Sequence, residues 1–212
     1  MLQKLQQWQA RREPWVEGKW LALDIETNGL DSRNDAMLAI AWVPIQPPLI
    51  LLDQAGYRVV KSAVNLNQSA VIHQLSAADI AAGLPLYDVL REFLAVAKGA
   101  NIVAHNAQFD LAVLASALKQ HNAADSANSL QWKPQGVYCT LAAERKRMQR
   151  RALSVQQGDL TLAGCRARYG FESFAGHQAL NDAVACAELF LAQAYRFGAG
   201  HQLTVKALLS EG

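Results

Sequence analysis

Three apolar runs near the start of the chain predict β-strands. Trp20–Glu26 is apolar up to its last residues and ends at Asn28-Gly29, a common turn signal. Ala36–Val43 and Leu49–Asp53 are two further apolar runs, and Pro47-Pro48 lies between them. Because strands that follow one another closely along the chain usually pair, we expect these three to form an antiparallel meander.

Apolar positions in the rest of the chain recur mainly at the three- and four-residue spacing of helices. Two short apolar segments, Asn101–Ala104 and Val137–Cys139, predict two more strands, and residues 121–135 predict a loop because their periodicity is weak. The predicted helices cover residues 79–97, interrupted at Gly83-Leu84-Pro85, and residues 108–120, 140–151, 160–169 and 178–196. This order predicts an α/β fold with a central mixed five-stranded sheet, a three-stranded antiparallel meander plus two parallel strands, flanked by helices.

Composition places these elements in one domain with short appendages. The 212 residues are 51% hydrophobic, which is ample for a buried core. Residues 1–17 alternate polar and apolar at helical spacing, so we expect an N-terminal helical extension over residues 1–19. The main domain then spans residues 20–198, and residues 199–212 form a C-terminal tail.

Charge and cysteine content argue against several classes of protein. No apolar run is long enough to span a membrane, and the charged N-terminus lacks the apolar core of a signal peptide, so we expect a cytoplasmic location. Three widely separated cysteines without a CxxC pair argue against a zinc site or a disulfide framework. A net charge of +2 is too small to indicate nucleic-acid binding by itself.

The densest positive charge in the chain is the run Arg145-Lys146-Arg147 with Arg150-Arg151. On one interpretation these side chains contact the phosphates of a nucleic acid, which makes binding salt-dependent. On the other they form a solvated helix face, as charge runs usually do. The sequence leaves both interpretations open.

Four carboxylates and one imidazole are the candidate reactive groups. Asp24 and Glu26 are two apart in a predicted strand, so their side chains share a face of the sheet. Asp110 lies at the start of a predicted helix, and His177 and Asp182 flank the start of the last one. Taken singly, each fits an ordinary strand end, helix start or surface position. Four converging carboxylates would repel one another unless divalent cations lay among them, and Mg²⁺ and Mn²⁺ prefer such oxygen ligands.

The segments that carry these residues resemble the motifs of DEDDh-type 3′→5′ exonucleases, the DnaQ-like branch of the RNase H-like nucleases. Asp24-Ile25-Glu26 resembles the first motif, and Thr27-Asn28-Gly29-Leu30 resembles the turn that follows it. His105-Asn106-Ala107-Gln108-Phe109-Asp110 resembles the second motif. His177 with Asp182 resembles the third, whose histidine defines the subtype.

The resemblance covers residues 20–196 and implies an RNase H-like fold for the predicted sheet. It departs from the family pattern at two positions. Asn28 stands where Thr is common, and Cys139 stands where an Asp often precedes Thr140. Neither position holds a metal in the family, so the departures concern the subfamily and leave the implied activity intact.

The resemblance implies a two-metal-ion mechanism with Mg²⁺ or Mn²⁺ as cofactors. Asp24, Glu26, Asp110 and Asp182 would hold the two ions, and His177 would act as the general base on the attacking water. The expected reaction is hydrolysis of the terminal phosphodiester at the 3′ end of single-stranded or frayed nucleic acid, with DNA favoured over RNA. Its products would be nucleoside 5′-monophosphates.

For substrate binding, the resemblance implies that the turn Thr27–Leu30 holds the terminal nucleotide, with Leu30 wedged beside its base. His105 and Asn106 would line the same cleft. Ordinary loop packing stays open as an alternative for Leu30, and local hydrogen bonds stay open as an alternative for His105 and Asn106.

Two other functions stay open. A non-catalytic nucleic-acid-binding or polymerase-accessory subunit of the same fold is disfavoured by the presence of all five reactive residues. A structure-selective endonuclease would cut circular substrates, on which an exonuclease has no end to begin. The expected partners are the 3′ ends of single-stranded DNA or RNA, and both a homodimer and a polymerase or repair assembly are compatible with the chain.

Overall fold

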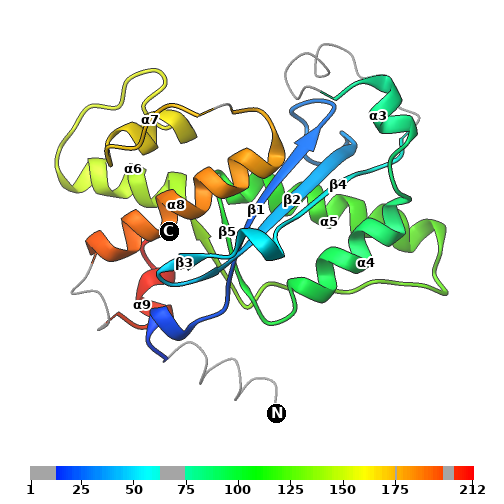
Figure 1. Ribbon diagram of the computed structural model, residues 1–212, viewed down its shortest axis with the longest axis horizontal. Coiled ribbons are helices and arrows are strands. Elements are labelled where there is room, and N and C mark those ends of the chain that lie inside the picture. Colours follow the sequence, from blue (N-terminus) through cyan, green and yellow to red (C-terminus); the bar gives the residue numbers. More distant parts are fainter. Residues whose placement is uncertain (1–12, 63–74, 175, 198–202) are drawn as a thin grey trace.

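The computed structural model describes residues 13–62, 75–174, 176–197 and 203–212. A mixed β-sheet runs through the centre, and helices cover both of its faces (Figure 1). This arrangement confirms the predicted α/β architecture of a mixed sheet flanked by helices. Most of the helix expected over residues 1–17 lies outside the described residues, and Trp15–Glu17 forms a 3₁₀ turn, η1.

Among the described residues the central sheet has six strands in the order β3-β2-β1-β5-β6, with β4 also paired to β2. β1 pairs antiparallel with β2 and parallel with β5, and β5 pairs parallel with β6. The strands are β1 (Trp20–Thr27), β2 (Met37–Gln46), β3 (Leu49–Ile50), β4 (Gly56–Val59), β5 (Asn101–Ala104) and β6 (Gly136–Cys139). β1 therefore joins the antiparallel half of the sheet to the parallel half.

The strand count differs from the expected five because the apolar run 49–53 does not stay in one strand. After the turn at Pro47-Pro48, only Leu49–Ile50 pair with the end of β2. Leu52–Gln54 then form a 3₁₀ turn, η2, and the chain returns to the same edge of β2 as β4. The hydrophobic pattern does not predict β4 because the strand is short and contains the charged residue Arg58.

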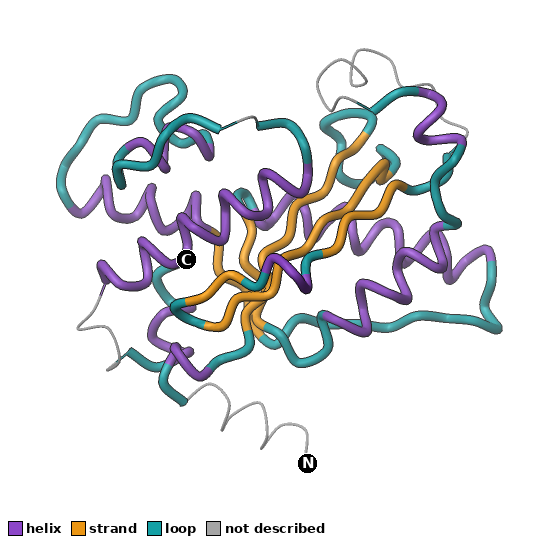
Figure 2. Tube along the Cα trace, viewed as in Figure 1, coloured by secondary structure: helices purple, strands orange, loops and turns teal. Residues whose placement is uncertain are grey.

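The helices lie on two faces of the sheet (Figure 1, Figure 2). One face carries α8 (Ala179–Phe197), which crosses β1 and β2, together with α6 (Thr140–Arg150) and α7 (Leu162–Ala167). The other face carries α4 (Leu86–Val96) and α5 (Ala107–Ala124), while the short helices α3 (Ala77–Ala81) and α9 (Val205–Leu209) lie at opposite ends of the sheet. No helix in the described parts of the chain combines the length and apolar character that crossing a membrane requires.

The alternation of side chains along β1 divides the interior into two cores. Trp20 and Ala22 belong to the cluster under α8, whereas Leu21, Leu23 and Ile25 belong to the cluster under α4 and α5. Successive side chains of a strand point to opposite faces, so both faces of β1 are buried. The strand that carries the first motif is thereby fixed on both sides.

Small side chains line the contact between α8 and the sheet. Ala22 of β1 and Ala41 of β2 share a buried cluster with Ala183 and Ala187 of α8, and all four are fully buried. Residues four apart on a helix lie on one face, so these alanines allow α8 to lie close to the strands. We call these four residues the alanine seam.

α5 is longer than expected, because its last turn reaches into the region 121–135 that was predicted as a loop. His121 is buried there, and its ring lies 5.1 Å from the ring of Tyr87. The side chain of Asn122 donates to the carbonyl of Leu130 at 2.8 Å and accepts from its N–H at 2.7 Å. These tertiary contacts extend the helix beyond its hydrophobic periodicity.

The two ends of the described chain meet beside the start of β1. The N–H of Trp15 donates to the carbonyl of Leu203 at 2.8 Å, and the N–H of Val205 donates to that of Glu13 at 2.9 Å. Val205 and Leu208 of α9 are fully buried in the core under α8. This C-terminal segment is therefore packed against the main body.

The contact between β2 and β4 gives a test of the fold. A Cβ added at Gly56 would lie 2.1 Å from Cζ2 of Trp42, the buried residue opposite it in β2. We expect Gly56→Ala to lower the free energy of unfolding in urea by about 1–3 kcal/mol, the usual cost of overpacking. The exposed control Gln54→Ala should change it by less than about 0.5 kcal/mol. Equal stability of Gly56→Ala and the wild type would contradict the close approach of Trp42.

Candidate active site

β1 carries two carboxylates to the face of the sheet that α8 covers. Asp24 and Glu26 continue the alternation of Trp20 and Ala22, which lie under α8. α8 supplies Asp182 from its first turn. One oxygen from each of Asp24, Glu26 and Asp182 lies within 4.8 Å of the other two. The strand and the helix thus bring together three of the expected metal ligands.

Asp110 approaches this cluster from the start of α5. It lies in the first turn of that helix and is only 4% exposed. Its Oδ1 accepts a hydrogen bond of 3.2 Å from the backbone N–H of Ile25, the residue between Asp24 and Glu26. This bond fixes the start of α5 to the middle of the first motif.

Burial and mutual repulsion raise the pKa values of two of the clustered carboxylates, Asp24 and Asp110. Burial is the main cause of a pKa of Asp24 well above its usual value, and the charges of Asp110, Glu26 and Asp182 raise it further. Burial also raises the pKa of Asp110 to about 8, although its hydrogen bonds to backbone N–H groups, including that of Ile25, oppose the shift. The cluster therefore favours a bound positive charge, either protons or a cation.

The donor set fits a divalent cation. Carboxylate oxygens are the ligands that Mg²⁺ and Mn²⁺ prefer, and three such oxygens are already gathered from Asp24, Glu26 and Asp182. A cation at this point would replace the protons that the raised pKa values otherwise retain. The acidic cluster thus supports the metal binding expected from the sequence.

His177 stands beside the cluster, two residues ahead of α8. Its backbone has a φ of 65°, in the left-handed region that few non-glycine residues adopt. Its N–H donates to Oδ2 of Asp182 at 3.2 Å, and its side chain is exposed. The structure therefore joins the backbone of His177 to the acidic cluster and leaves its imidazole accessible.

The turn after β1 is closed by its own side chains. The hydroxyl of Thr27 donates to the carbonyl of Gly29 at 2.5 Å, and Oδ1 of Asn28 accepts from the N–H of Ala36 at 2.6 Å. A Cβ added at Gly29 would lie 2.4 Å from Oδ2 of Asp35, so a larger residue at position 29 would displace the Asp35 side chain. The side chains of Thr27 and Asn28 thus shape the turn.

Leu30 projects from this turn into solvent. Its surface is 94% exposed, the highest value among the large apolar side chains of the described residues. The alternative of ordinary loop packing is therefore wrong for Leu30. An apolar side chain four residues after Glu26 is available for contact with a ligand.

His105 is held inside the chain. Its Nδ1 lies 2.9 Å from the hydroxyl of Thr140, and its Nε2 lies 2.9 Å from the carbonyl oxygen of Leu160. Because a carbonyl only accepts, we assign the proton to Nε2 and let Nδ1 accept from the hydroxyl. Burial lowers the pKa of His105, which favours this neutral ring.

His105 therefore holds its segment through hydrogen bonds to residues distant in the sequence, not through local ones, while Asn106 is exposed at the start of α5 with a φ of 68°. Sequence reasoning missed Thr140 and Leu160 as the residues that fix His105. The one signal in the sequence is that Thr140 directly follows one of the two predicted parallel strands, just as His105 directly follows the other.

Much of the basic run at residues 145–151 is bonded within the chain. The intrachain contacts are Arg147 with Glu144, Arg150 with Glu211, and Lys146 with the carbonyl of Ser210. The first contact lies within α6, and the other two join α6 to the C-terminal segment. Three of the five basic side chains in this run therefore already have partners within the chain.

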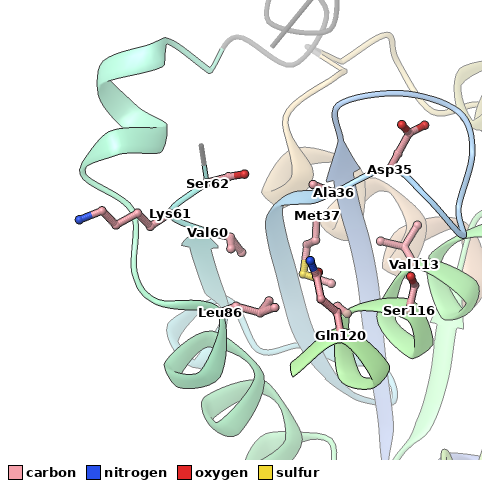
Figure 3. Close-up of a pocket in the computed structure, with 11 residues that line it drawn as sticks. Asp35, Ala36, Met37, Val60, Lys61, Ser62, Leu86, Val113, Ser116 and Gln120 are labelled. Carbon is pink, nitrogen blue, oxygen red and sulfur yellow. The ribbon is translucent and has the colours of Figure 1, made fainter. Parts of the chain in front are cut away.

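A cavity of about 420 Å³ lies on the face of the sheet that α5 covers (Figure 3). Met37, Val60 and Val113 give it an apolar wall, and Ser116 and Gln120 of α5 add polar groups. None of the clustered carboxylates is among its described lining residues. The cavity is therefore separate from the acidic cluster, although Met37 pairs with the last residue of β1.

Comparison with known proteins identifies the class to which this fold and site belong. The mixed sheet with helices on both faces is an RNase H-like fold, and carboxylates gather beside its central strand. A family model described as "Exonuclease" matches residues 21–190, a range that contains all five reactive residues. The chain belongs to this exonuclease family and carries the motifs of its DEDDh-type, DnaQ-like branch.

Two curated relatives illustrate the similarity. "DNA polymerase III PolC-type" from Caldanaerobacter subterraneus subsp. tengcongensis is 35% identical over 113 residues, which cover 51% of this chain and 8% of the polymerase. "Ribonuclease T" from Haemophilus ducreyi is 28% identical over 197 residues, which cover 82% of this chain and 84% of the ribonuclease. The chain thus matches only about a tenth of the length of the PolC-type polymerases, 8% of one and 12% of another.

Solved structures share the fold at low sequence identity. Exonuclease I superimposes with a TM-score of 0.68 and 16% identity, over 82% of this chain and 40% of that chain. Exonuclease X in complex with 5′-overhanging duplex DNA gives a TM-score of 0.61 and 21% identity, over 91% of this chain and 98% of that chain. These likenesses confirm the predicted fold class.

The carboxylate cluster predicts how stability depends on pH in metal-free buffer. Because the pKa of Asp110 is about 8 when folded and about 3.9 in an unfolded chain, its stabilising contribution is complete below about pH 4 and is lost as the pH rises through 8. Asp110→Asn removes the titrating carboxyl group and retains a side-chain oxygen that can accept from the N–H of Ile25. At pH 8 with a chelator, we expect Asp110→Asn to melt about 10 °C or more above the wild type, with a smaller difference at pH 5.5.

Asp53→Asn, an exposed substitution on η2, is the matched control and should follow the wild type at both pH values. Added Mg²⁺ should raise the melting temperature of the wild type more than that of Asp110→Asn, because the cation replaces the bound proton. A variant that melts no higher than the wild type at pH 8 would contradict the raised pKa of Asp110.

Proposed function

We propose that the protein is a 3′→5′ exonuclease that uses divalent cations to hydrolyse the terminal phosphodiester of a nucleic acid. The observation that carries this proposal is the convergence of Asp24, Glu26, Asp110 and Asp182 beside the exposed ring of His177. Membership of an exonuclease family supports the same reaction class. The products are nucleoside 5′-monophosphates.

The acidic residues hold the cofactor in this proposal. Asp24, Glu26 and Asp182 hold one Mg²⁺ or Mn²⁺, and Asp110 takes part in holding a second. When bound, such cations offset the charge of the phosphate and make a neighbouring water more acidic. Burial of Asp110 and its bond to Ile25 keep these ligands in place before the substrate arrives.

His177 is the proton acceptor. Residue 177 is exposed, and its backbone N–H is bonded to Asp182, so His177 lies at the edge of the acidic cluster. It accepts a proton from the attacking water as the water oxygen bonds to the terminal phosphorus. The bond between that phosphorus and the 3′ oxygen of the preceding nucleotide breaks, and the oxygen takes a proton from solvent.

The turn Thr27–Leu30 selects the chain end. Thr27 and Asn28 close the turn through bonds to Gly29 and Ala36, and Leu30 projects from it. The backbone of this turn and the side chain of Leu30 hold the terminal nucleotide. Asn106 is exposed at the start of α5 and adds a polar contact, while His105 acts from inside by holding the segment that leads to Asp110.

The substrate we favour is single-stranded or frayed DNA. The similar structures include E. coli exonuclease I with a dA16 oligonucleotide and exonuclease X with 5′-overhanging duplex DNA. Ribonuclease T among the relatives keeps RNA as the second candidate. The PolC-type relatives favour association with a polymerase or repair assembly in the cytoplasm over a homodimer.

Degradation of 5′-labelled single-stranded DNA and RNA on denaturing gels tests the proposal. With Mg²⁺ or Mn²⁺ we expect products that shorten from the 3′ end, faster for DNA, and none with a chelator. His177→Ala should lower the rate about 100-fold or more, the usual contribution of a general base. Circular single-stranded DNA should stay intact.

Other outcomes of this assay assign other functions. Cleavage of the circle would establish an endonuclease. No degradation of either polymer in either metal would support the non-catalytic accessory subunit, and a metal titration would then show whether the acidic cluster binds cations at all.

Leu30 gives a separate test of substrate contact. Because the side chain is 94% exposed, Leu30→Ala should leave the melting temperature unchanged. We expect KM for a DNA oligonucleotide to rise about 3- to 10-fold, which corresponds to about 1 kcal/mol of lost apolar contact. Leu49→Ala, 60% exposed on β3 at the opposite end of the sheet, is the matched control with unchanged KM. An unchanged KM for Leu30→Ala would remove Leu30 from the site.

A further inference from the structure

Arg166 is a buried cation near the end of α7, outside the carboxylate cluster. It is 6% exposed, and its Nη1 donates to the carbonyl of Ala185 at 2.9 Å and to the carboxylate of Glu188. Both partners belong to α8, and Ala185 lies one helical turn beyond Asp182. Arg166 therefore ties α7 to the part of α8 that carries a metal ligand.

The guanidinium of Arg166 also contacts two rings in the segment between α7 and α8. Its Cζ lies 4.6 Å from the centre of the Phe171 ring and 4.9 Å from that of Phe174, within the range of cation–π attraction. The backbone N–H of Phe171 donates to the carbonyl of Arg166 at 3.3 Å. One arginine thus holds both rings of this segment against α7 and α8.

Phe174 connects this contact to the third motif. A Cβ added at Gly176 would lie 3.7 Å from Cε2 of Phe174 and 3.5 Å from Oδ1 of Asp182, so residue 176 lies against both side chains. His177 follows with its φ of 65° and its N–H bonded to Asp182. A non-glycine residue keeps such a backbone conformation only where its surroundings hold it there.

We infer that Arg166 and Phe174 form a clamp that positions His177 for proton transfer. The inference rests on the proposed function, because it concerns the step assigned to His177. Arg166 is a positioning residue that acts through Phe174 and touches none of the reacting groups. Accurate placement of an exposed general base matters, because a misplacement of about 1 Å costs about 100-fold in rate.

Phe174→Leu tests the clamp from its accessible side. Phe174 is half-buried, so the substitution keeps an apolar side chain and removes the ring that meets Arg166 and lies against residue 176. We expect kcat on single-stranded DNA to fall about 10-fold or more, with KM within about twofold and an unchanged melting temperature. Phe174→Tyr restores an aromatic face and should restore kcat.

A double-mutant cycle separates positioning from a general effect on the fold. If Phe174 acts through His177, Phe174→Leu should cause no further loss of kcat in a His177→Ala background. An equal fold-loss of kcat from Phe174→Leu in the wild-type and His177→Ala backgrounds would overturn the inference. So would a wild-type kcat in Phe174→Leu.

A second readout does not depend on catalysis. Hydrogen exchange of the His177 amide, which bonds to Asp182, should be faster in Phe174→Leu and normal in Phe174→Tyr. If the wild type shows no exonuclease activity, the proposed function fails and this measurement alone decides the clamp. Faster exchange in Phe174→Leu would then support the clamp, and unchanged exchange would overturn it.

Discussion

Mutual repulsion among buried carboxylates is the constraint on which the rest of the molecule depends. Asp24 and Asp110 gather with Glu26 and Asp182 where burial disfavours the charges of the first two, so the surrounding elements must hold the four against their tendency to separate. β1 is fixed between two cores, and α5 is bonded to its backbone at Ile25. The fold stores an unfavourable arrangement that a cation relieves, which is how a rigid scaffold prepares a metal site before the metal arrives.

The features of the site that sequence reasoning predicted are those set by local geometry. The period of two along β1 places Asp24 and Glu26 together, and the helix starts place Asp110 and Asp182 within reach of them. The order of strands and helices likewise predicts a mixed sheet with helices on both faces. The alternation along β1 and the order of the elements are present in the residues themselves, whereas the meeting of Asp110 and Asp182 with Asp24 and Glu26 was implied by the resemblance of their motifs to those of DEDDh-type exonucleases.

The features that sequence reasoning missed depend on contacts between distant segments. β4 is too short to show a hydrophobic pattern and exists because β2 offers it an edge. The basic run 145–151 has the composition of a nucleic-acid contact, yet Glu144 and Glu211 pair with two of its arginines. His105 turns inward because Thr140 and Leu160 meet both of its ring nitrogens. The spacing of apolar residues along the chain does not indicate partners that are distant in the sequence.

The alanine seam bears on which ion the site prefers. The alanine seam lets α8 lie close to β1 and β2 near the start of the helix, and this spacing helps to set how far Asp182 stands from Asp24 and Glu26. Mg²⁺ needs oxygens at about 2.1 Å, whereas Ca²⁺ takes them at about 2.3–2.6 Å in looser shells. A bulkier residue at Ala183 or Ala187 would push the start of α8 away from the strands, and with it Asp182. In this fold, the spacing of the acidic ligands is a property of the packing between a helix and a sheet.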